Sequence, residues 1–402
     1  MSAQPLATNP GSGHVETGTA GAAPAVVATA EPRTRLRRFG AEEELFLVAR
    51  HDGTAVSQAG YVVARLAVTC PPGDGRPGGS VVHEMAKQQI ETNSRPHSEL
   101  AELAQEVRDW RARAAEVAAE VGASIVASGT YPGNVCSDVM ADVRYESMLE
   151  RFGITAREHL TSGFHVHVEV DSRDEAVGVL DRIRVWLPTL LAMSANSPFW
   201  NGQDTGYASY RYPALGRWPS TGPTELLSSP EAYDALVESM VGSGVLLDRA
   251  MVYFDARISE RYPTVEVRIA DVCLDVRDAV LLAALCRALV HTAAERWAQG
   301  VPPPQVPVAL LRLASWRAAH DGLEGELLDP VTGHPRPAGD VVTDLIDGVR
   351  PALREYGDEG YVDAAARQLR LRGTGARRQR EIYRSTGSFR DVLADLRWQT
   401  LG

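Results

Sequence analysis

The sequence contains little cysteine. Its 402 residues include four cysteines, Cys70, Cys136, Cys273 and Cys286, which form neither a Cys-x-x-Cys pair nor a Cys/His cluster. Scattered cysteines of this kind indicate neither a disulfide framework nor a structural zinc site. We therefore expect a protein of the reducing cytoplasm.

The chain also lacks a long hydrophobic run. Its longest apolar stretch, residues 279–290, contains Arg287 and is shorter than the roughly 20 residues that cross a bilayer. A short apolar piece at residues 25–28 precedes a group of arginines, whereas a secretory signal carries its positive charges first. The sequence therefore predicts no membrane span and no signal peptide, and residues 279–290 are expected to form a buried helix.

An excess of basic residues is absent as well. Lys and Arg number 41 against 52 Asp and Glu, which gives a formal net charge of −11. Because a nucleic-acid binder needs a basic surface to neutralise phosphates, this balance argues against such partners and favours small-molecule substrates. The oligomeric state is left open, a homo-oligomer included.

The first part of the chain differs in composition from the rest. Residues 1–36 are rich in Ala, Gly, Thr and Pro and show no periodicity, so they cannot bury enough surface to offset the entropy of ordering them. We predict a flexible, disordered tail over residues 1–36. No repeat or linker divides the remainder, so residues 37–402 are expected to form a single catalytic domain.

Helical periodicity is clearest in three segments. In residues 100–121 the apolar positions are separated alternately by three and four residues, which predicts an amphipathic helix that ends before Gly122. A second helix is predicted over residues 175–193, interrupted near Pro188. A third, over residues 276–297, is apolar almost all round and is expected in the core.

Short segments with alternating polarity predict strands at residues 39–48, 87–93, 163–170 and 264–270, with a further strand at 253–258. None of them is the continuous Val/Ile run of a strand buried on both faces. We therefore expect a sheet with one apolar face covered by helices and one polar face that forms a cleft.

Each of the four main strands presents chemically active side chains on one face, since residues i and i+2 point the same way. These are Glu42 and Glu44; Gln89, Glu91 and Asn93; His165 and His167; and Thr264, Glu266 and Arg268. Several carboxylates on one surface repel one another unless a cation is present. A carboxylate-dominated set suits Mg²⁺ or Mn²⁺, so the sequence predicts a metal site.

Taken singly, most of these features have an ordinary structural explanation. A Glu-x-Glu pair is usually a solvated strand face, and Glu266 with Arg268 is more often a structural ion pair. The two histidines are more specific, because neighbouring imidazoles in a core need partners. The joint occurrence of all four patterns favours a functional site.

Seven segments follow one another in a characteristic order. They are residues 40–44 (GAEEE), 162–167 (SGFHVH), 194–200 (SANSPFW), 204–211 (DTGYASYR), 263–271 (PTVEVRIAD), 314–317 (ASWR) and 373–380 (GTGARRQR). This set resembles the type-2 glutamate–cysteine ligases, a carboxylate–amine ligase family. The resemblance implies an α+β, glutamine-synthetase-like catalytic fold, in which a mainly antiparallel sheet backed by long helices forms a polar cleft for ATP and metal ions.

The resemblance also implies roles for individual residues. Metal ligands are expected at Glu42, Glu44, Glu91, His165 and Glu266. Arg268, near the transferred phosphate, and Glu266 are expected to be catalytic, with Arg268 and His167 on the ATP side. Arg211 is a candidate for contact with a substrate carboxylate, with a surface salt bridge as the alternative. Independently of the resemblance, Asp255 and Arg257 alternate on the further strand and are expected to line the same cleft as substrate contacts. The glycines and arginines of segment 373–380 predict a loop that offers donors to an anion, with a basic solvated turn as the more common alternative.

The expected function is therefore an ATP- and Mg²⁺- or Mn²⁺-dependent carboxylate–amine ligase that forms an amide through an acyl phosphate, of the glutamate–cysteine ligase type. Two alternatives remain at this point. One is a metal-dependent hydrolase in which His165, His167 and a glutamate hold zinc and activate water. The other is a metabolite-binding protein without catalysis. The identity of the acid and of the amine is not readable from the sequence.

Overall fold

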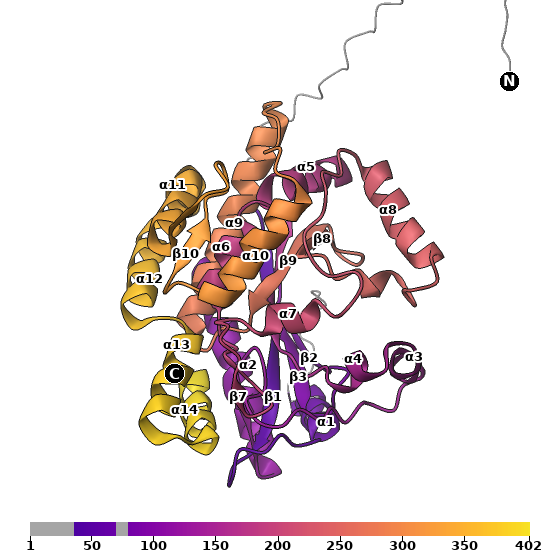
Figure 1. Cartoon of the computed structure of the whole chain (residues 1–402), viewed down its shortest axis with the longest axis vertical. Coiled ribbons are helices and arrows are strands. Elements are labelled where there is room, and N and C mark those ends of the chain that lie inside the picture. Colours follow the sequence, from indigo (N-terminus) through magenta and orange to yellow (C-terminus); the bar gives the residue numbers. More distant parts are fainter. Residues whose placement is uncertain (1–35, 70–78) are drawn as a thin grey trace, which may run out of the picture. The chain divides into compact units, whose positions relative to one another are not determined.

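The computed structural model of the chain describes residues 36–69 and 79–402. The described residues belong to one compact unit (Figure 1). The predicted tail, apart from Leu36, lies outside the described residues. Among the helices described, none is long and apolar enough to cross a membrane.

The centre of the structure is a seven-stranded sheet in which every pairing is antiparallel. The strand order is β2-β3-β1-β5-β9-β8, and β4 also pairs with β1. The strands are β1 (Phe39–Ala49), β2 (Ser80–His83), β3 (Gln89–Asn93), β4 (Ala123–Val126), β5 (Gly163–Glu169), β8 (Ala256–Ile258) and β9 (Thr264–Asp271). The four main predicted strands are confirmed, and the fifth is shorter than predicted. Strands β2 and β4 were not predicted.

The register of this sheet brings the polar residues of separate strands together. Glu44 lies opposite Glu91 on β3, Glu42 lies opposite His165 on β5, and His167 lies opposite Glu266 on β9. A bulge between Phe164 and Val166 shifts the β5–β9 register. Because residues paired across strands share a face, the predicted polar surface is present.

Long helices cover the apolar face. They are α2 (Leu100–Glu120), α5 (Arg173–Ile183), α6 (Leu187–Ser194) and α9 (Val276–Ala298), and all four contact strands of the sheet. Helix α9 is buried along most of its length and packs in one apolar cluster with Val166 and Val168 of β5. Three helical predictions are confirmed, and the expected interruption falls at residues 184–186, with Pro188 in the first turn of α6.

The remaining elements surround this core (Figure 1). The helices are α1 (Ala59–Thr69), α3 (Val143–Phe152), α4 (Ile154–Arg157), α7 (Arg211–Leu215), α8 (Pro230–Gly242), the 3-10 turn η1 (Arg249–Met251), α10 (Val308–Asp321), α11 (Ala338–Tyr356), α12 (Glu359–Arg372), α13 (Gly375–Thr386) and α14 (Phe389–Leu401). Two small ribbons are formed by β6 (Phe199–Trp200) with β7 (Gln203–Asp204) and by β10 (Glu326–Leu328) with β11 (Pro335–Pro337).

The prediction of a loop at residues 373–380 is wrong. Helix α12 ends at Arg372 and is followed by Gly373, whose φ of +81° is a conformation that favours glycine. Helix α13 then begins at Gly375, so most of the segment is helical. The two closely spaced glycines suggested a loop, whereas they mark the junction between two helices.

One charged pair lies on the apolar side of the sheet. Glu43 of β1 and Arg111 of α2 are each 1% exposed, and two hydrogen bonds of 2.9 and 2.7 Å join the guanidinium to the carboxylate. The other guanidinium hydrogens are donated to backbone carbonyls of Cys273, Leu274 and Thr400. The pair therefore joins the central strand to α2, to the segment after β9 and to the C-terminal helix.

Replacing Arg111 by alanine should strongly destabilise the protein, because Glu43 would be left as a buried charge without a partner. We expect the free energy of unfolding to fall by about 3–5 kcal/mol, measured by urea denaturation. The control is Arg65→Ala, which breaks the exposed pair with Glu120 and should cost no more than about 1 kcal/mol. Equal losses in the two variants would contradict a stabilising role for the buried pair.

Candidate functional site

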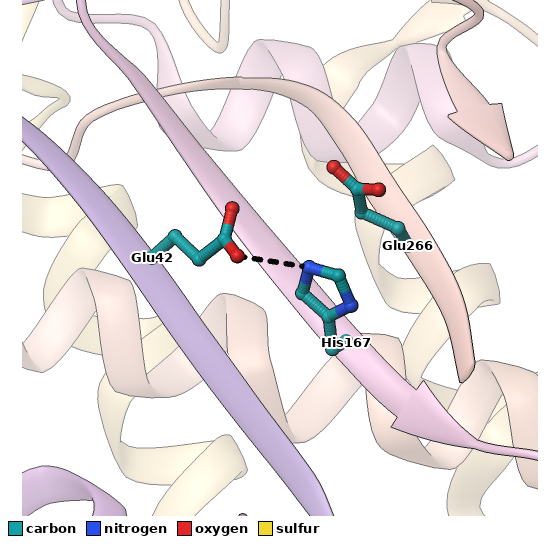
Figure 2. A group of neighbouring side chains, drawn as sticks. All are labelled: Glu42, His167 and Glu266. Atoms are coloured by element: carbon teal, nitrogen blue, oxygen red, sulfur yellow. Dashed lines mark ion pairs between the residues drawn. The ribbon is translucent and has the colours of Figure 1, made fainter. Parts of the chain in front are cut away.

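Three side chains from three neighbouring strands form a first group on the polar face, Glu42, His167 and Glu266 (Figure 2). One potential ligand atom from each lies within 4.8 Å of the others. The Nε2 atom of His167 is 3.2 Å from Glu42 Oε1 and is buried, and among the described residues it has no hydrogen-bond partner of ordinary geometry. The other ring nitrogen, Nδ1, is 2.9 Å from the hydroxyl of Thr264.

A second group consists of three carboxylates, Glu44, Glu84 and Glu91, whose oxygens also approach within 4.8 Å. Burial and then the neighbouring carboxylates raise the pKa of Glu91 well above its usual range. Burial and the charge of Glu44 raise the pKa of Glu84 to about 7. Such shifts show that the three negative charges are unfavourable together without a nearby cation.

His165 lies between the two groups. Its Nδ1 atom is 3.1 Å from Glu42 Oε2, and its Nε2 atom is 3.8 Å from Glu44 Oε1. Burial and the charge of Arg268 lower the pKa of His165. For His167 burial acts in the same direction, but the contact with Glu42 and the charge of Glu266 outweigh it and raise the pKa.

Both groups fit divalent cations. Carboxylate oxygens dominate them, which suits Mg²⁺ or Mn²⁺. His167 has the arrangement of a metal ligand, with one nitrogen held by a neighbouring hydroxyl and the other buried beside two carboxylates without a hydrogen bond. The resemblance assigned the ligand role to His165, whereas the geometry groups His167 with Glu42 and Glu266.

Two arginines flank the first group. Arg257 of β8 donates a 2.8 Å hydrogen bond to Glu266, and Arg268 of β9 also contacts this carboxylate. Burial opposes ionisation of Glu266, but the charges of Arg268 and Arg257 lower its pKa far below the usual range. Glu266 is therefore held as a carboxylate, and the ion pair considered from the sequence is present.

A cavity of about 140 Å³ adjoins the second group. Its wall includes the polar side chains of Glu44, Glu84, Arg144, Tyr145, His159, His165, Arg211, Tyr212, Tyr253, Asp255 and Arg268 and apolar ones such as Met148 and Trp218. The cavity therefore combines cationic, anionic and aromatic groups in a small enclosed volume, as ligand sites do.

Arg211 and Asp255 are two buried charged groups of this cavity with few polar partners. Arg211 is 3% exposed and forms no ion pair within the described residues; its guanidinium donates only long bonds of 3.3 and 3.4 Å to carbonyls of β9. Asp255 is 4% exposed and accepts a 3.2 Å bond from Tyr212 Oη. Burial raises the pKa of Asp255 to about 7. A ligand that carries both a carboxylate and an ammonium group would match these two side chains, the carboxylate facing Arg211 and the ammonium group facing Asp255.

Most of the site residues inferred from the sequence are brought together. Glu42, Glu44, Glu91, His165, His167, Glu266 and Arg268 share the polar face, and Arg211 and Asp255 line the cavity. Arg257 contacts Glu266 and is not part of the cavity wall. The arginines of the segment 373–380 pair elsewhere, with Glu381, Asp395 and Asp204.

Sequence reasoning missed Glu84, Arg144 and Tyr212. Glu84 follows β2, which pairs Val82 with Glu91, so alternation would have placed Glu84 on the polar face had the strand been recognised. Strand β2 is short and contains the apolar pair Val81-Val82, which hides that alternation. Arg144 and Tyr212 lie on helices, and no strand pattern points to them.

Comparison with known proteins gives a consistent result. Residues 38–395 match the family glutamate–cysteine ligase family 2. The chain is 46% identical over 367 residues to a Streptomyces avermitilis protein named "Putative glutamate–cysteine ligase 2-1", with 91% of this chain and 100% of that protein covered. It is 45% identical over 359 residues to "Putative glutamate–cysteine ligase 2" of Streptomyces coelicolor, with 89% and 98% covered.

Among solved structures, a glutamate–cysteine ligase from Francisella tularensis in complex with AMP matches with a TM-score of 0.63 at 13% identity, covering 91% of this chain and 89% of that one. A bifunctional glutathione synthetase from Pasteurella multocida matches with a TM-score of 0.60 at 15% identity, covering 91% and 52%. At these identities the likeness concerns the fold. The predicted fold class, α+β and glutamine-synthetase-like, is confirmed.

Replacing His167 by alanine should weaken Mn²⁺ binding at least about tenfold, because the first group would lose its only nitrogen ligand. The free Mn²⁺ signal in electron paramagnetic resonance measures this affinity. The control is His320→Ala, which removes an imidazole of α10 outside both carboxylate groups. Normal binding by the His167 variant, together with loss in His165→Ala, would assign the metal to His165 instead.

The raised pKa of Asp255 predicts a pH-dependent stability. Because the folded state favours the protonated form, this group contributes stability below pH 4 that is lost as the pH rises through about 7. Without ligands, the melting temperature of the wild type should therefore fall more between pH 5 and 8 than that of Asp255→Asn, measured by scanning calorimetry. Parallel profiles for the two proteins would show that Asp255 titrates normally.

Proposed function

This chain belongs to the ligase family named glutamate–cysteine ligase family 2, and from this premise we propose that it is an ATP-dependent carboxylate–amine ligase of the glutamate–cysteine ligase type. The observation that carries the proposal is the position of the two carboxylate groups. They lie on one sheet face, and the second of them adjoins a cavity that contains a buried arginine with no ionic partner among the described residues. A nucleotide with metal ions and a carboxylate substrate would meet there.

The carboxylates would hold Mg²⁺ or Mn²⁺. Glu44, Glu84 and Glu91 form one set of ligands, and Glu42 and Glu266 with a histidine form the other. When bound, the cations supply positive charge that holds the ATP phosphates and offsets their repulsion from the glutamates. They would also offset the burial and mutual repulsion that raise the pKa of Glu84 and Glu91.

Arg268 is proposed to stabilise the phosphoryl group during transfer. Its guanidinium lines the cavity and contacts Glu266, so it lies where the metal-binding face and the cavity meet. The negative charges of Glu266 and Glu42 outweigh burial and raise its pKa, so the side chain stays charged. A fixed, planar cation with several donors suits the equatorial oxygens of a transferring phosphoryl group.

The substrate carboxylate is proposed to face Arg211, and an ammonium group of an amino-acid substrate to face Asp255. Both side chains are almost fully buried, so an interaction with a ligand would occur in a medium where it is stronger than in water. At neutral pH a cationic group would favour the ionised form of Asp255, because the carboxyl titrates near pH 7 without one.

The proposed reaction has two steps. A carboxylate oxygen of the acid attacks the γ-phosphorus of ATP, the bond to the β-phosphate oxygen breaks, and ADP leaves behind an acyl phosphate. The amine nitrogen then attacks the acyl carbon, phosphate leaves, and the nitrogen loses a proton to give the amide. We place this reaction in the cytoplasm and in a single catalytic domain that spans residues 37–402.

Replacing Glu266 by glutamine should abolish turnover, because a metal ligand is lost while side-chain volume is kept. Phosphate release from ATP with Mg²⁺ should require an acid and an amine together, with glutamate and cysteine as the first pair and an amide detected by mass spectrometry. We expect a loss of at least about 10³-fold in the variant. The control, Glu260→Gln, removes an exposed carboxylate paired with Arg249 and should remain fully active.

Normal turnover by the Glu266 variant would overturn the site assignment. Turnover of ester or amide substrates without ATP would instead support the zinc hydrolase considered from the sequence. Phosphate release with another acid and amine, but none with glutamate and cysteine, would keep the ligase reaction and replace its reference substrates.

A further inference from the structure

A third cluster of metal-ligating side chains lies away from the polar face. His291 and Glu295 are four residues apart on α9, and Glu355 lies near the end of α11. Helix α9 packs against the apolar side of the sheet and, on its other side, against α11 (Figure 1). The cluster is therefore separate from the proposed ligase site.

The distances from His291 Nε2 to the two carboxylate oxygens match the ligand–ligand distances around a tetrahedrally coordinated ion. His291 Nε2 is 3.4 Å from Glu295 Oε1 and 3.4 Å from Glu355 Oε2, and all three atoms lie within 4.8 Å of one another. Four ligands placed about 2.1 Å from a zinc ion lie about 3.4 Å from each other. The three atoms thus occupy positions that could be corners of one coordination polyhedron.

The orientation of the His291 ring is a second indication of a metal site. The side chain is 8% exposed, and its Nδ1 atom is 2.8 Å from Tyr356 Oη, whose ring packs edge-on against the imidazole. The Nε2 atom is equidistant from two carboxylates and forms a hydrogen bond with neither within the described residues. A direct charge-assisted hydrogen bond would bring the nitrogen to about 2.8 Å from one oxygen, so the 3.4 Å separations leave room for an ion between the three groups.

We propose that His291, Glu295 and Glu355 form a site for Zn²⁺, with the fourth position open to water. An imidazole nitrogen with two carboxylates is a ligand set that zinc accepts. The Tyr356 hydroxyl supplies the outer contact that fixes the ring, as in many histidine metal sites. The two glutamates are about half exposed, so the ion can enter from solvent. Binding joins α9 to α11.

This site has the same ligand types as the group of Glu42, His167 and Glu266, one imidazole and two carboxylates, but its carboxylates are about half exposed. Because an imidazole with carboxylates favours Zn²⁺ over Mg²⁺, zinc can also reach the polar face, and variants of each group separate the two sites. The site does not depend on the proposed ligase reaction, since no residue of the cluster lines the cavity or the polar face.

The test is calorimetric titration of Zn²⁺ into the chelator-treated full chain in millimolar Mg²⁺. We expect a zinc-binding step at the helical site, with a dissociation constant that rises at least about tenfold in Glu355→Gln and in Glu295→Gln. Both residues are half exposed, so these variants should fold. The matched control is Asp340→Asn, which removes a carboxylate of the same α11 helix outside the cluster and should bind zinc as the wild type does.

Two further measurements locate the ion. Zinc should raise the melting temperature of the wild type and of Asp340→Asn more than that of Glu355→Gln, because this variant lacks a ligand of the ion held between α9 and α11. His167→Ala, altered in the polar-face group with the same ligand types, should keep the difference between Asp340→Asn and Glu355→Gln. No zinc binding in the wild type, or equal affinity in Glu355→Gln, would overturn the proposal and leave a cluster of ion pairs around His291.

Discussion

The site depends on the register of strand β1 at the centre of the sheet. Glu42 and Glu44 point to the polar face, while Ala41, Glu43 and Leu45 point to the packed face. Because side chains alternate along a strand, a shift by one residue would exchange the two sets. The buried pair of Glu43 with Arg111 opposes such a shift, since the guanidinium would lose the one carboxylate placed to compensate it.

The electrostatics of the polar face vary along the sheet. On the β9 side, Glu266 is flanked by Arg257 and Arg268 and remains ionised. On the β3 side, the carboxylates have mainly one another as neighbours, and the pKa of Glu91 rises. On the β9 side, two arginines balance the charge of Glu266. On the β3 side, the carboxylates repel one another, and an added cation would stabilise them most. This gradient gives the two groups different metal-binding properties although they share one surface.

The cavity retains charges that a stable core would avoid. Arg211 is buried among backbone carbonyls of β9 and forms no ion pair with a carboxylate of the described residues, so its desolvation is only partly offset. Asp255 shows the same imbalance through its raised pKa. Uncompensated groups of opposite sign in one enclosed space are common where a ligand completes the pairing. The helical cluster at His291 differs, because its two carboxylates are about half exposed to solvent.

The sequence by itself determined the alternation of the strands, the amphipathic helices and the ordered motifs that identify the family, because these depend on local spacing. It therefore located Glu42, Glu44, Glu91, both histidines, Glu266 and Arg268 on one face. Only the tertiary structure decided that Glu84 joins this face, that Arg211 and Asp255 meet in a cavity, and that Glu355 approaches His291. The tertiary structure also decided that the segment from Gly375 is helical and not a loop. These contacts join residues distant in the chain, and no local pattern encodes the packing that brings them together.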